Sequence, residues 1–333
     1  MAGAVDPTPL LRLRDGIYAA DLAVAAVAEL DLFTAIGDRA LSSAALAAAL
    51  GLAERPVVAM CDVLESLGLL ERDGDSFAAT PLARAYLSAG GDADLRPYFA
   101  SLAERPAVRE LAGVLRTGAP AAWASSRGGE DWAARLADPG FAERFTAAMD
   151  ARGRVLGPAL AEALGGLPFR RVLDVAGGSG IYASALLDAN AELEVSVLER
   201  PPVDEVTRTL LARRGHDAIH VIAGDMFAGL PPGYDLHLFS HVLHDWDVPE
   251  VTSVIELSFG ALPANGWIVD YDVHGGGRGD PSAAAFSALL MHSTEGRCYS
   301  VAEVDGLMRR AGFVDVEVRR TIGDRSAVCA RRP

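Results

Sequence analysis

A glycine-rich turn between an apolar strand and a helix constrains this 333-residue chain more than any other feature. The stretch 172–180 reads VLDVAGGSG, and a helix signal follows over 181–187. Glycines at such a turn let the backbone approach a ligand closely, and the helix N-terminus adds aligned N–H donors. Asp174 precedes the first glycine, and its carboxylate repels a pyrophosphate but attracts a cation or an amine. The stretch therefore predicts a nucleotide-type site for a positively charged ligand.

From residue 170 onward, segments typical of strands and of helices alternate. This alternation predicts a parallel sheet with helices on both faces and with ligands at the carboxyl ends of its strands. The last two strands are joined by only about seven residues, so we expect them to form an antiparallel hairpin at the sheet edge. The expected strands are 171–175, 194–198, 219–223, 235–240, 267–272, 314–318 and 326–330, and the expected helices are 181–188, 203–214, 249–261 and 301–311.

The N-terminal region reads as short helices followed by a hairpin whose turn is marked by Asp73 and Gly74. This order is typical of a winged helix. The second helix of the motif carries acidic residues that offset Arg55, which argues against DNA binding. The expected helices are 17–30, 32–36, 41–47 (with Ser42 or Ser43 as N-cap) and 55–67, and the hairpin spans 69–80. A long helix is also expected over 141–164.

Net charge and cysteine content exclude several classes of protein. The formal net charge is −15, so the chain repels phosphates and anionic lipid, and neither nucleic acid nor membrane is an expected partner. Three scattered cysteines predict neither a disulfide framework nor a zinc site. Without a visible signal peptide or an uncharged apolar run of about 18 residues, we expect a protein of the reducing cytoplasm.

Polar side chains follow the second and third expected strands. Glu199 ends the second strand, where an acid can accept hydrogen bonds from both hydroxyls of a ribose. Asp225 and Met226 follow the third strand and suit the amino group and the ring of an adenine. An ordinary strand-end turn with a core methionine explains that last pair equally well.

The richest polar cluster, SHVLHDWD at 240–247, follows the fourth strand. His244 is suited to act as a general base near neutral pH. Trp246 would stack on an adenine or cap the core. Asp272 ends the fifth strand at the same sheet edge, where it would orient His244 and stabilise its imidazolium. His292 would complete a two-histidine, one-carboxylate metal site with His244, or would be a pocket or core histidine.

These motifs resemble the S-adenosylmethionine (SAM)-dependent O-methyltransferases related to plant caffeate, bacterial polyketide and acetylserotonin enzymes. The resemblance rests on 174–180, 224–227 and 244–246 and covers nearly the whole chain. It implies an α/β fold, a homodimer and a small-molecule acceptor. The implied divisions are an α-helical winged-helix-like dimerisation domain (1–95), a helical linker and acceptor-pocket region (96–168), and a Rossmann-like SAM domain with a seven-stranded, mostly parallel sheet (169–333).

The resemblance also implies roles for individual residues. His244 would deprotonate an acceptor hydroxyl, with Asp272 and Asp245 as its acidic partners. The acceptor pocket would include Phe145, Met149, Arg152 and His292. The cofactor would be bound by Asp174, Gly177, Gly178, Gly180, Glu199, Asp225, Met226, Phe227, Ser240 and Trp246.

Two positions depart from the family pattern. Ala176 stands where the family usually has glycine, and a methyl group there should be tolerable. Cys298 stands where the family usually has a second carboxylate beside the base. The base has therefore lost one of its two orienting groups.

The loss at Cys298 keeps a second chemistry open. Some relatives are metal-dependent and methylate the β-carbon of 2-oxo acids with a His-Asp pair and a distant histidine. His244, Asp245 and His292 match that set, with a divalent or ferric metal acidifying the β-C–H and Arg152 or Arg154 clamping the carboxylate.

These residues are compatible with four hypotheses for the function. O-methylation of a small hydroxylated compound of secondary metabolism ranks first, and metal-dependent C-methylation follows it. A SAM-fold regulator without catalytic activity is a third hypothesis. An NAD-dependent dehydrogenase is disfavoured by Asp174 and by the absence of a G-x-G-x-x-G turn. The sequence does not identify the acceptor.

Overall fold

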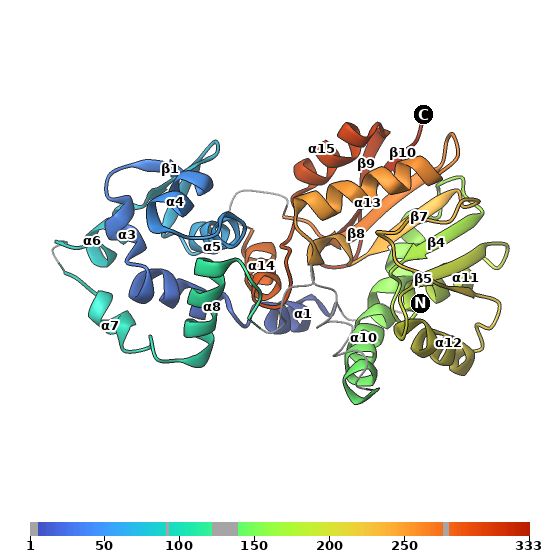
Figure 1. Ribbon diagram of the computed structural model, residues 1–333, viewed down its shortest axis with the longest axis horizontal. Coiled ribbons are helices and arrows are strands. Elements are labelled where there is room, and N and C mark those ends of the chain that lie inside the picture. The colour runs from blue at the N-terminus through green and yellow to red at the C-terminus, as the bar shows by residue number, and fades with distance from the viewer. Residues whose placement is uncertain (1–5, 91–92, 122–138, 276–279) are drawn as a thin grey trace. The chain divides into compact units, whose positions relative to one another are not determined.

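The computed structural model describes residues 6–90, 93–121, 139–275 and 280–333 of the chain (Figure 1). Contacts divide the chain into two compact units. Unit 1 comprises Met1–Thr8, Gly129–His274 and Tyr299–Pro333, and unit 2 comprises Pro9–Gly128 and Gly275–Cys298. Among the described residues no single helix is long and apolar enough to cross a membrane; only the bent pair Ser43–Leu50 and Glu54–Ser66 reaches that length and composition together.

Unit 2 has the expected order of helices followed by a hairpin. The Ser42 side chain accepts a hydrogen bond from the Ala45 backbone N–H at 3.1 Å and caps the next helix, as predicted. The predicted hairpin is confirmed, with Asp73 paired to Ser76. A short additional strand pairs with it, which the sequence did not reveal. The elements are α1 (Thr8–Asp15), α2 (Ala19–Val24), a π-helical turn η1 (Ala25–Glu29), α3 (Leu32–Ile36), β1 (Ala40–Ser42), α4 (Ser43–Leu50), α5 (Glu54–Ser66), β2 (Leu70–Asp73), β3 (Ser76–Ala79), α6 (Pro81–Leu87), α7 (Arg96–Ala100) and α8 (Pro106–Thr117), with strand order β1-β3-β2.

One helix from the C-terminal half of the sequence belongs to unit 2. Helix α14 (Pro281–Ser293) packs against α5, α2 and α8, and its Ala284, Ala288 and Met291 side chains join the core of that unit. The sequence predicted no helix here, because α14 is buried on every face and has no amphipathic period. Residues 275–298 therefore group with the N-terminal unit and not with the sheet that precedes and follows them in the sequence.

Unit 1 is built on the expected seven-stranded, mostly parallel sheet. Its strand order is β6-β5-β4-β7-β8-β10-β9, and the strands from β4 to β8 are parallel. The predicted C-terminal hairpin is confirmed, and its second strand also pairs antiparallel with β8. The strands are β4 (Arg171–Val175), β5 (Glu194–Glu199), β6 (His220–Ala223), β7 (Leu236–Ser240), β8 (Trp267–Val273), β9 (Val314–Arg320) and β10 (Arg325–Arg331).

Helices cover both faces of this sheet (Figure 1). One group consists of α10 (Pro139–Leu164), α11 (Ile181–Ala189) and α12 (Val203–Arg214), in which α10 contacts the other two helices. The other group consists of α13 (Val248–Ala261) and α15 (Val301–Ala311), which contact each other. The order of the strands reverses between β4 and β7, and ligands of such sheets bind beside the carboxyl ends at that point. The residues that follow β4, β7 and β8 are therefore placed together.

Candidate active site

The glycine turn after β4 is shaped around the buried carboxylate of Asp174. A Cβ atom at Gly177 would lie 2.5 Å from an Asp174 carboxylate oxygen, so no larger residue fits while this carboxylate keeps its place. Gly178 and Gly180 have φ values of 57° and 69°, which L side chains rarely adopt. No described atom lies within 4 Å of a Cβ built on Gly178, so the turn is open on that side.

Asp174 itself is fully buried and lacks a charged partner. Neither carboxylate oxygen meets hydrogen-bond geometry with a described residue, although the Ala183 backbone N–H offsets part of the cost of burial. Burial raises the pKa of Asp174 to about 8, and the Glu199 carboxylate raises it further. A buried carboxyl group of this kind is suited to a ligand that brings a positive charge.

Ala176, in the same turn, has a φ of 52°. The methyl group is accommodated, but the left-handed conformation costs about 1–2 kcal/mol for a residue with a Cβ atom. We expect Ala176→Gly to raise the melting temperature of the protein by about 2–4 °C per kcal/mol released. Thermal denaturation measures this, with Ala212→Gly on the exposed side of α12 as the control that lowers stability by about 0.5–1 kcal/mol. A lower melting temperature for Ala176→Gly would contradict the strain.

Glu199 and Asp225 extend the site along the sheet edge. Glu199, at the end of β5, accepts hydrogen bonds from the backbone N–H groups of Gly178 (2.9 Å) and Arg200 (2.8 Å). The hydrogen bond from Gly178 connects the end of β5 to the glycine turn. Asp225 follows β6 and accepts from the Phe227 N–H at 3.0 Å. The predicted carboxylates thus lie at the carboxyl ends of consecutive neighbouring strands.

An aromatic group lies beyond these acids. Phe227 and Trp246 form an edge-to-face pair with ring centroids 4.6 Å apart, and Met226 is buried. The Trp246 carbonyl accepts a hydrogen bond from the Tyr299 hydroxyl at 2.7 Å, which anchors the segment after β7. Ser240, at the end of β7, is buried and its hydroxyl has no hydrogen-bond partner among the described residues.

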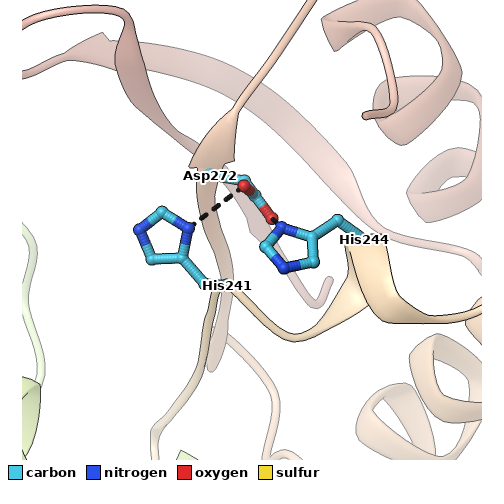
Figure 2. A group of neighbouring side chains, drawn as sticks. All are labelled: His241, His244 and Asp272. Atoms are coloured by element: carbon cyan, nitrogen blue, oxygen red, sulfur yellow. Dashed lines mark ion pairs between the residues drawn. The ribbon is translucent and has the colours of Figure 1, made fainter. Parts of the chain in front are cut away.

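His244 lies in a short 3-10 turn, η3 (Leu243–Asp245), and faces Asp272 on β8. Its Nδ1 atom is 2.6 Å from Oδ2 of Asp272, and both side chains are buried (Figure 2). The predicted pairing of these two residues therefore exists in the structure. Asp245 is different: its side chain is 43% exposed, and its Oδ1 lies 3.5 Å from the His244 Nε2 atom.

Burial and charge act in opposite directions on His244. Burial disfavours the imidazolium, but the carboxylates of Asp272 and Asp245 together outweigh it and raise the pKa of His244 above its usual value. The His244 and His241 rings in turn hold the pKa of Asp272 well below its usual range, against the effect of burial. An imidazole held by an ionised carboxylate on one nitrogen can take up a proton on the other.

Sequence reasoning missed His241, which contacts the same carboxylate. Its Nδ1 atom lies 3.2 Å from Oδ1 of Asp272, opposite the oxygen that faces His244 (Figure 2). Its ring lies against Tyr182 and Tyr271, with centroids 6.0 and 5.5 Å away. The sequence signal that could have identified His241 is its position three residues before the motif His244-Asp245-Trp246.

Helix α10 supplies the predicted acceptor-pocket residues of unit 1. Phe145 and Met149 are half-buried on it. Arg152 lies near enough to lower the pKa of His241 and to oppose the burial-raised pKa of Tyr182. The Arg152 Nε atom and the Tyr182 hydroxyl are both buried and make no hydrogen bond that meets strict geometry with the described residues.

His292 belongs to unit 2 and not to the unit that holds His244. Its Nε2 atom lies 2.8 Å from a carboxylate oxygen of Glu110, and its ring stacks on Tyr18 with centroids 4.2 Å apart. The histidine at this position is thus engaged within its own unit. Cys298 is buried in the same unit, and its backbone N–H donates to the Ser287 hydroxyl at 3.0 Å.

One group of described residues has metal-ligating atoms close together, namely His241, His244 and Asp272, within 4.8 Å of one another. It differs from the predicted set of His244, Asp245 and His292, whose members lie in two units. A cation at the observed group would have to replace the 2.6 Å contact between His244 and Asp272.

Two family models and several known proteins match this chain. A family model described as an O-methyltransferase domain matches residues 108–314, and one described as an O-methyltransferase dimerisation domain matches residues 12–89. The chain is 30% identical to the tetracenomycin polyketide synthesis 8-O-methyl transferase TcmO of Streptomyces glaucescens, over 98% of this chain and 97% of that protein. It is 32% identical to an L-tyrosine C(3)-methyltransferase of Streptomyces lavendulae, over 43% of this chain and 41% of that one.

A solved structure is similar over almost the whole length. The O-methyltransferase family 2 protein from Planctomyces limnophilus, in complex with apigenin, is 27% identical and superposes with a TM-score of 0.86. The match covers 99% of this chain and 97% of that chain. Both the sheet of unit 1 and the helical unit 2 therefore have counterparts in one known methyltransferase.

Proposed function

Because this chain belongs to the O-methyltransferase family, we propose that it transfers the methyl group of SAM to a hydroxyl group of a small molecule of secondary metabolism, with His244 as general base. The observation that carries the assignment of the base is the 2.6 Å contact between His244 Nδ1 and Asp272 Oδ2 at the carboxyl ends of β7 and β8. This contact leaves Nε2 as the basic nitrogen of the ring.

The residues of the turn fit a cofactor that combines a cationic amino-acid end with a nucleoside. The buried Asp174 carboxylate, which has no cationic partner among the described residues, suits a positive charge, and the open side of Gly178 leaves room above the turn. Glu199 would receive the ribose, and Asp225, Met226 and Phe227 the adenine, with Trp246 beside them. Ser240 would contact the cofactor near the end of β7. When bound, SAM supplies an electrophilic methyl group on a sulfonium.

The protein would contribute position and one proton transfer. His244 would accept the proton of the acceptor hydroxyl on Nε2, which would leave the oxygen able to receive the methyl group that bound SAM would supply. Asp272 stabilises the imidazolium through Nδ1–H, and Asp245 adds negative charge on the open side. Holding the reacting atoms in line supplies much of the acceleration in such a transfer. The proton then leaves His244 to solvent.

The acceptor would lie against α10, where Phe145 and Met149 offer apolar contact and Arg152 offers a positive charge for an acidic group. We place the homodimer contact in the region matched by the dimerisation domain, residues 12–89. The test of the function is methyl transfer from radiolabelled SAM to a panel of phenols, naphthols and hydroxylated polyketides. Absence of turnover on all of them, with SAM bound, would favour a non-catalytic role.

Chelation distinguishes O-methylation from metal-dependent C-methylation of a 2-oxo acid. We expect turnover to change by less than about twofold after dialysis against EDTA, since the proposed steps need only His244 and Asp272. Elemental analysis of the dialysed protein verifies that metals are gone. Loss of turnover that Fe²⁺ or Zn²⁺ restores would instead support the set His244, Asp245 and His292, with Arg152 on the substrate carboxylate.

A further inference from the structure

Asp272 is clamped between two imidazole rings that come from the same short segment. Oδ1 faces Nδ1 of His241 at 3.2 Å and also accepts a hydrogen bond from the Val273 backbone N–H at 2.7 Å. Oδ2 faces Nδ1 of His244 at 2.6 Å (Figure 2). All three side chains are buried. A carboxylate with contacts on both oxygens has lost the freedom to rotate about its Cβ–Cγ bond. The orientation of the oxygen that faces His244 is therefore coupled to the contact on the other side.

The backbone of His241 is arranged to make this clamp. His241 follows the last residue of β7 and has a φ of 56°, the left-handed conformation that few side chains adopt without cost. Its N–H still donates to the Tyr271 carbonyl at 2.9 Å, so the chain stays attached to β8 while it turns. Strained positions of this kind persist where the surrounding structure holds them, often at functional sites.

The neighbours of His241 determine its protonation. They are Arg152 on α10, Tyr182 on α11, Tyr271 and Asp272 on β8, and His244 after β7. Burial, followed by the positive charge of Arg152, lowers the pKa of His241 to about 3, despite the opposing effect of Asp272. A neutral ring beside a carboxylate carries its single hydrogen on the nitrogen that faces it. We therefore assign a hydrogen to Nδ1, which donates to Asp272.

We propose that His241 is a positioning residue for the reaction: its Nδ1–H, beside the Val273 backbone N–H, holds Oδ1 of Asp272, so that Oδ2 keeps the His244 ring in the tautomer and orientation that present Nε2 to the acceptor. This inference rests on His244 being the base. A neutral clamp is suited to the task, because a second cation would compete with the His244 imidazolium for the charge of Asp272.

Two substitutions separate this role from simple packing. In His241→Asn the amide nitrogen takes the place of Nδ1 and can donate to Asp272, and asparagine tolerates a positive φ. In His241→Gln the amide lies one carbon farther out, near the place of Nε2. Both variants introduce a carboxamide, so their side chains have similar polarity. Equal melting temperatures of the two variants would show that both are folded.

The first measurement is kcat with an acceptor found in the panel. We expect His241→Gln to lower kcat by about 10- to 100-fold, the usual worth of a hydrogen bond to a charged group. His241→Asn should restore kcat to within about threefold of the original enzyme, and the Kd of SAM should stay within about threefold in both. Equal losses in both variants, or no loss in either, would overturn the proposal.

The second measurement needs no acceptor. Titration of isotope-labelled histidines by NMR follows His244 directly, with assignment from the His244→Ala variant. Asp272 raises the pKa of His244, so a displaced Asp272 should lower that pKa in His241→Gln but not in His241→Asn. An unchanged His244 titration in His241→Gln would overturn the clamp. The NMR titration does not depend on turnover. If His244→Ala retained turnover, that result would contradict only the assignment of His244 as the base.

A third measurement tests whether His241, His244 and Asp272 bind a metal ion instead. Elemental analysis of the protein as purified should show no stoichiometric transition metal. A bound metal that is lost in His241→Asn would make His241, His244 and Asp272 its ligands and would overturn the positioning role.

Discussion

Replacing His244 by alanine is expected to lower kcat by about 10²–10⁴-fold, the usual contribution of general acid–base catalysis. The variant loses the imidazole that Asp272 holds in place for proton uptake, while the proposed cofactor residues near the ends of β4, β5 and β6 remain. The Kd of SAM should therefore stay within about threefold of the original value. Radiolabel transfer gives kcat, and calorimetric titration gives the Kd.

The pH dependence supplies a second signature of His244. Asp272 and Asp245 hold its pKa above the usual histidine value of 6.5 despite burial. Only the unprotonated ring can act as a base, so kcat should rise with pH through a midpoint above 6.5, and this limb should vanish in His244→Ala. His216→Ala, at a histidine paired with Asp188 away from the proposed site, is the control that should keep full activity. A His244→Ala enzyme with unimpaired turnover would eliminate the proposed base.

Replacing Asp174 by asparagine is expected to weaken SAM binding by about 10- to 100-fold, or roughly 1.4–3 kcal/mol. In the original protein the cationic amino group of the cofactor would ionise Asp174 on binding, since burial holds the pKa of this carboxyl near 8 beforehand. Binding near pH 7 should therefore release a proton, and Asp174→Asn should not. Calorimetry in buffers of different ionisation enthalpy measures both the affinity and the proton count.

The same substitution should stabilise the protein without ligand. The pKa of Asp174 is raised on folding from its usual 3.8, so below that value both states are protonated and burial carries no ionisation penalty. As the pH rises from about 4 to about 8 the unfolded state ionises first, and the folded protein loses stability. The melting temperature of Asp174→Asn should thus exceed that of the original protein increasingly over this range.

Asp188→Asn, at an exposed carboxylate on α11, serves as the matched control for both effects. It should alter neither SAM affinity nor the pH dependence of melting near pH 8. If Asp174→Asn bound SAM as tightly as the original protein, the cofactor's positive charge would have to be held elsewhere.

Local signals in the sequence were sufficient for most elements of unit 1. Strand β4 runs over Arg171–Val175 as expected, because its residues form a short apolar run that ends at a glycine turn. The C-terminal hairpin was inferred from the length of its loop alone. Helix α14 was missed because its few polar residues are scattered around the helix, and a helix without a polar face has no period to detect. The three-residue strand β1 is too short to produce a pattern.

The residues of the candidate site were likewise predicted only in part. Asp174, Glu199 and Asp225 were predicted because each lies at or just beyond the carboxyl end of a strand, and parallel strands end at one edge. His292 was grouped with His244 on chemistry alone, but the contacts of its helix place it in unit 2, beside Glu110 and Tyr18. His241 was overlooked because its role depends on a left-handed backbone angle that the residue type does not predict.

The sequence by itself determined the order of strands and helices, the glycine turn and the chemistry available at the strand ends. These features arise from interactions within about ten residues, which side-chain periodicity and turn composition report directly. Only the tertiary structure decided which side chains meet. The alignment of β7 with β8 brings Asp272 between His241 and His244, and the assignment of one oxygen to each ring depends on sheet register and backbone angles that no local pattern specifies.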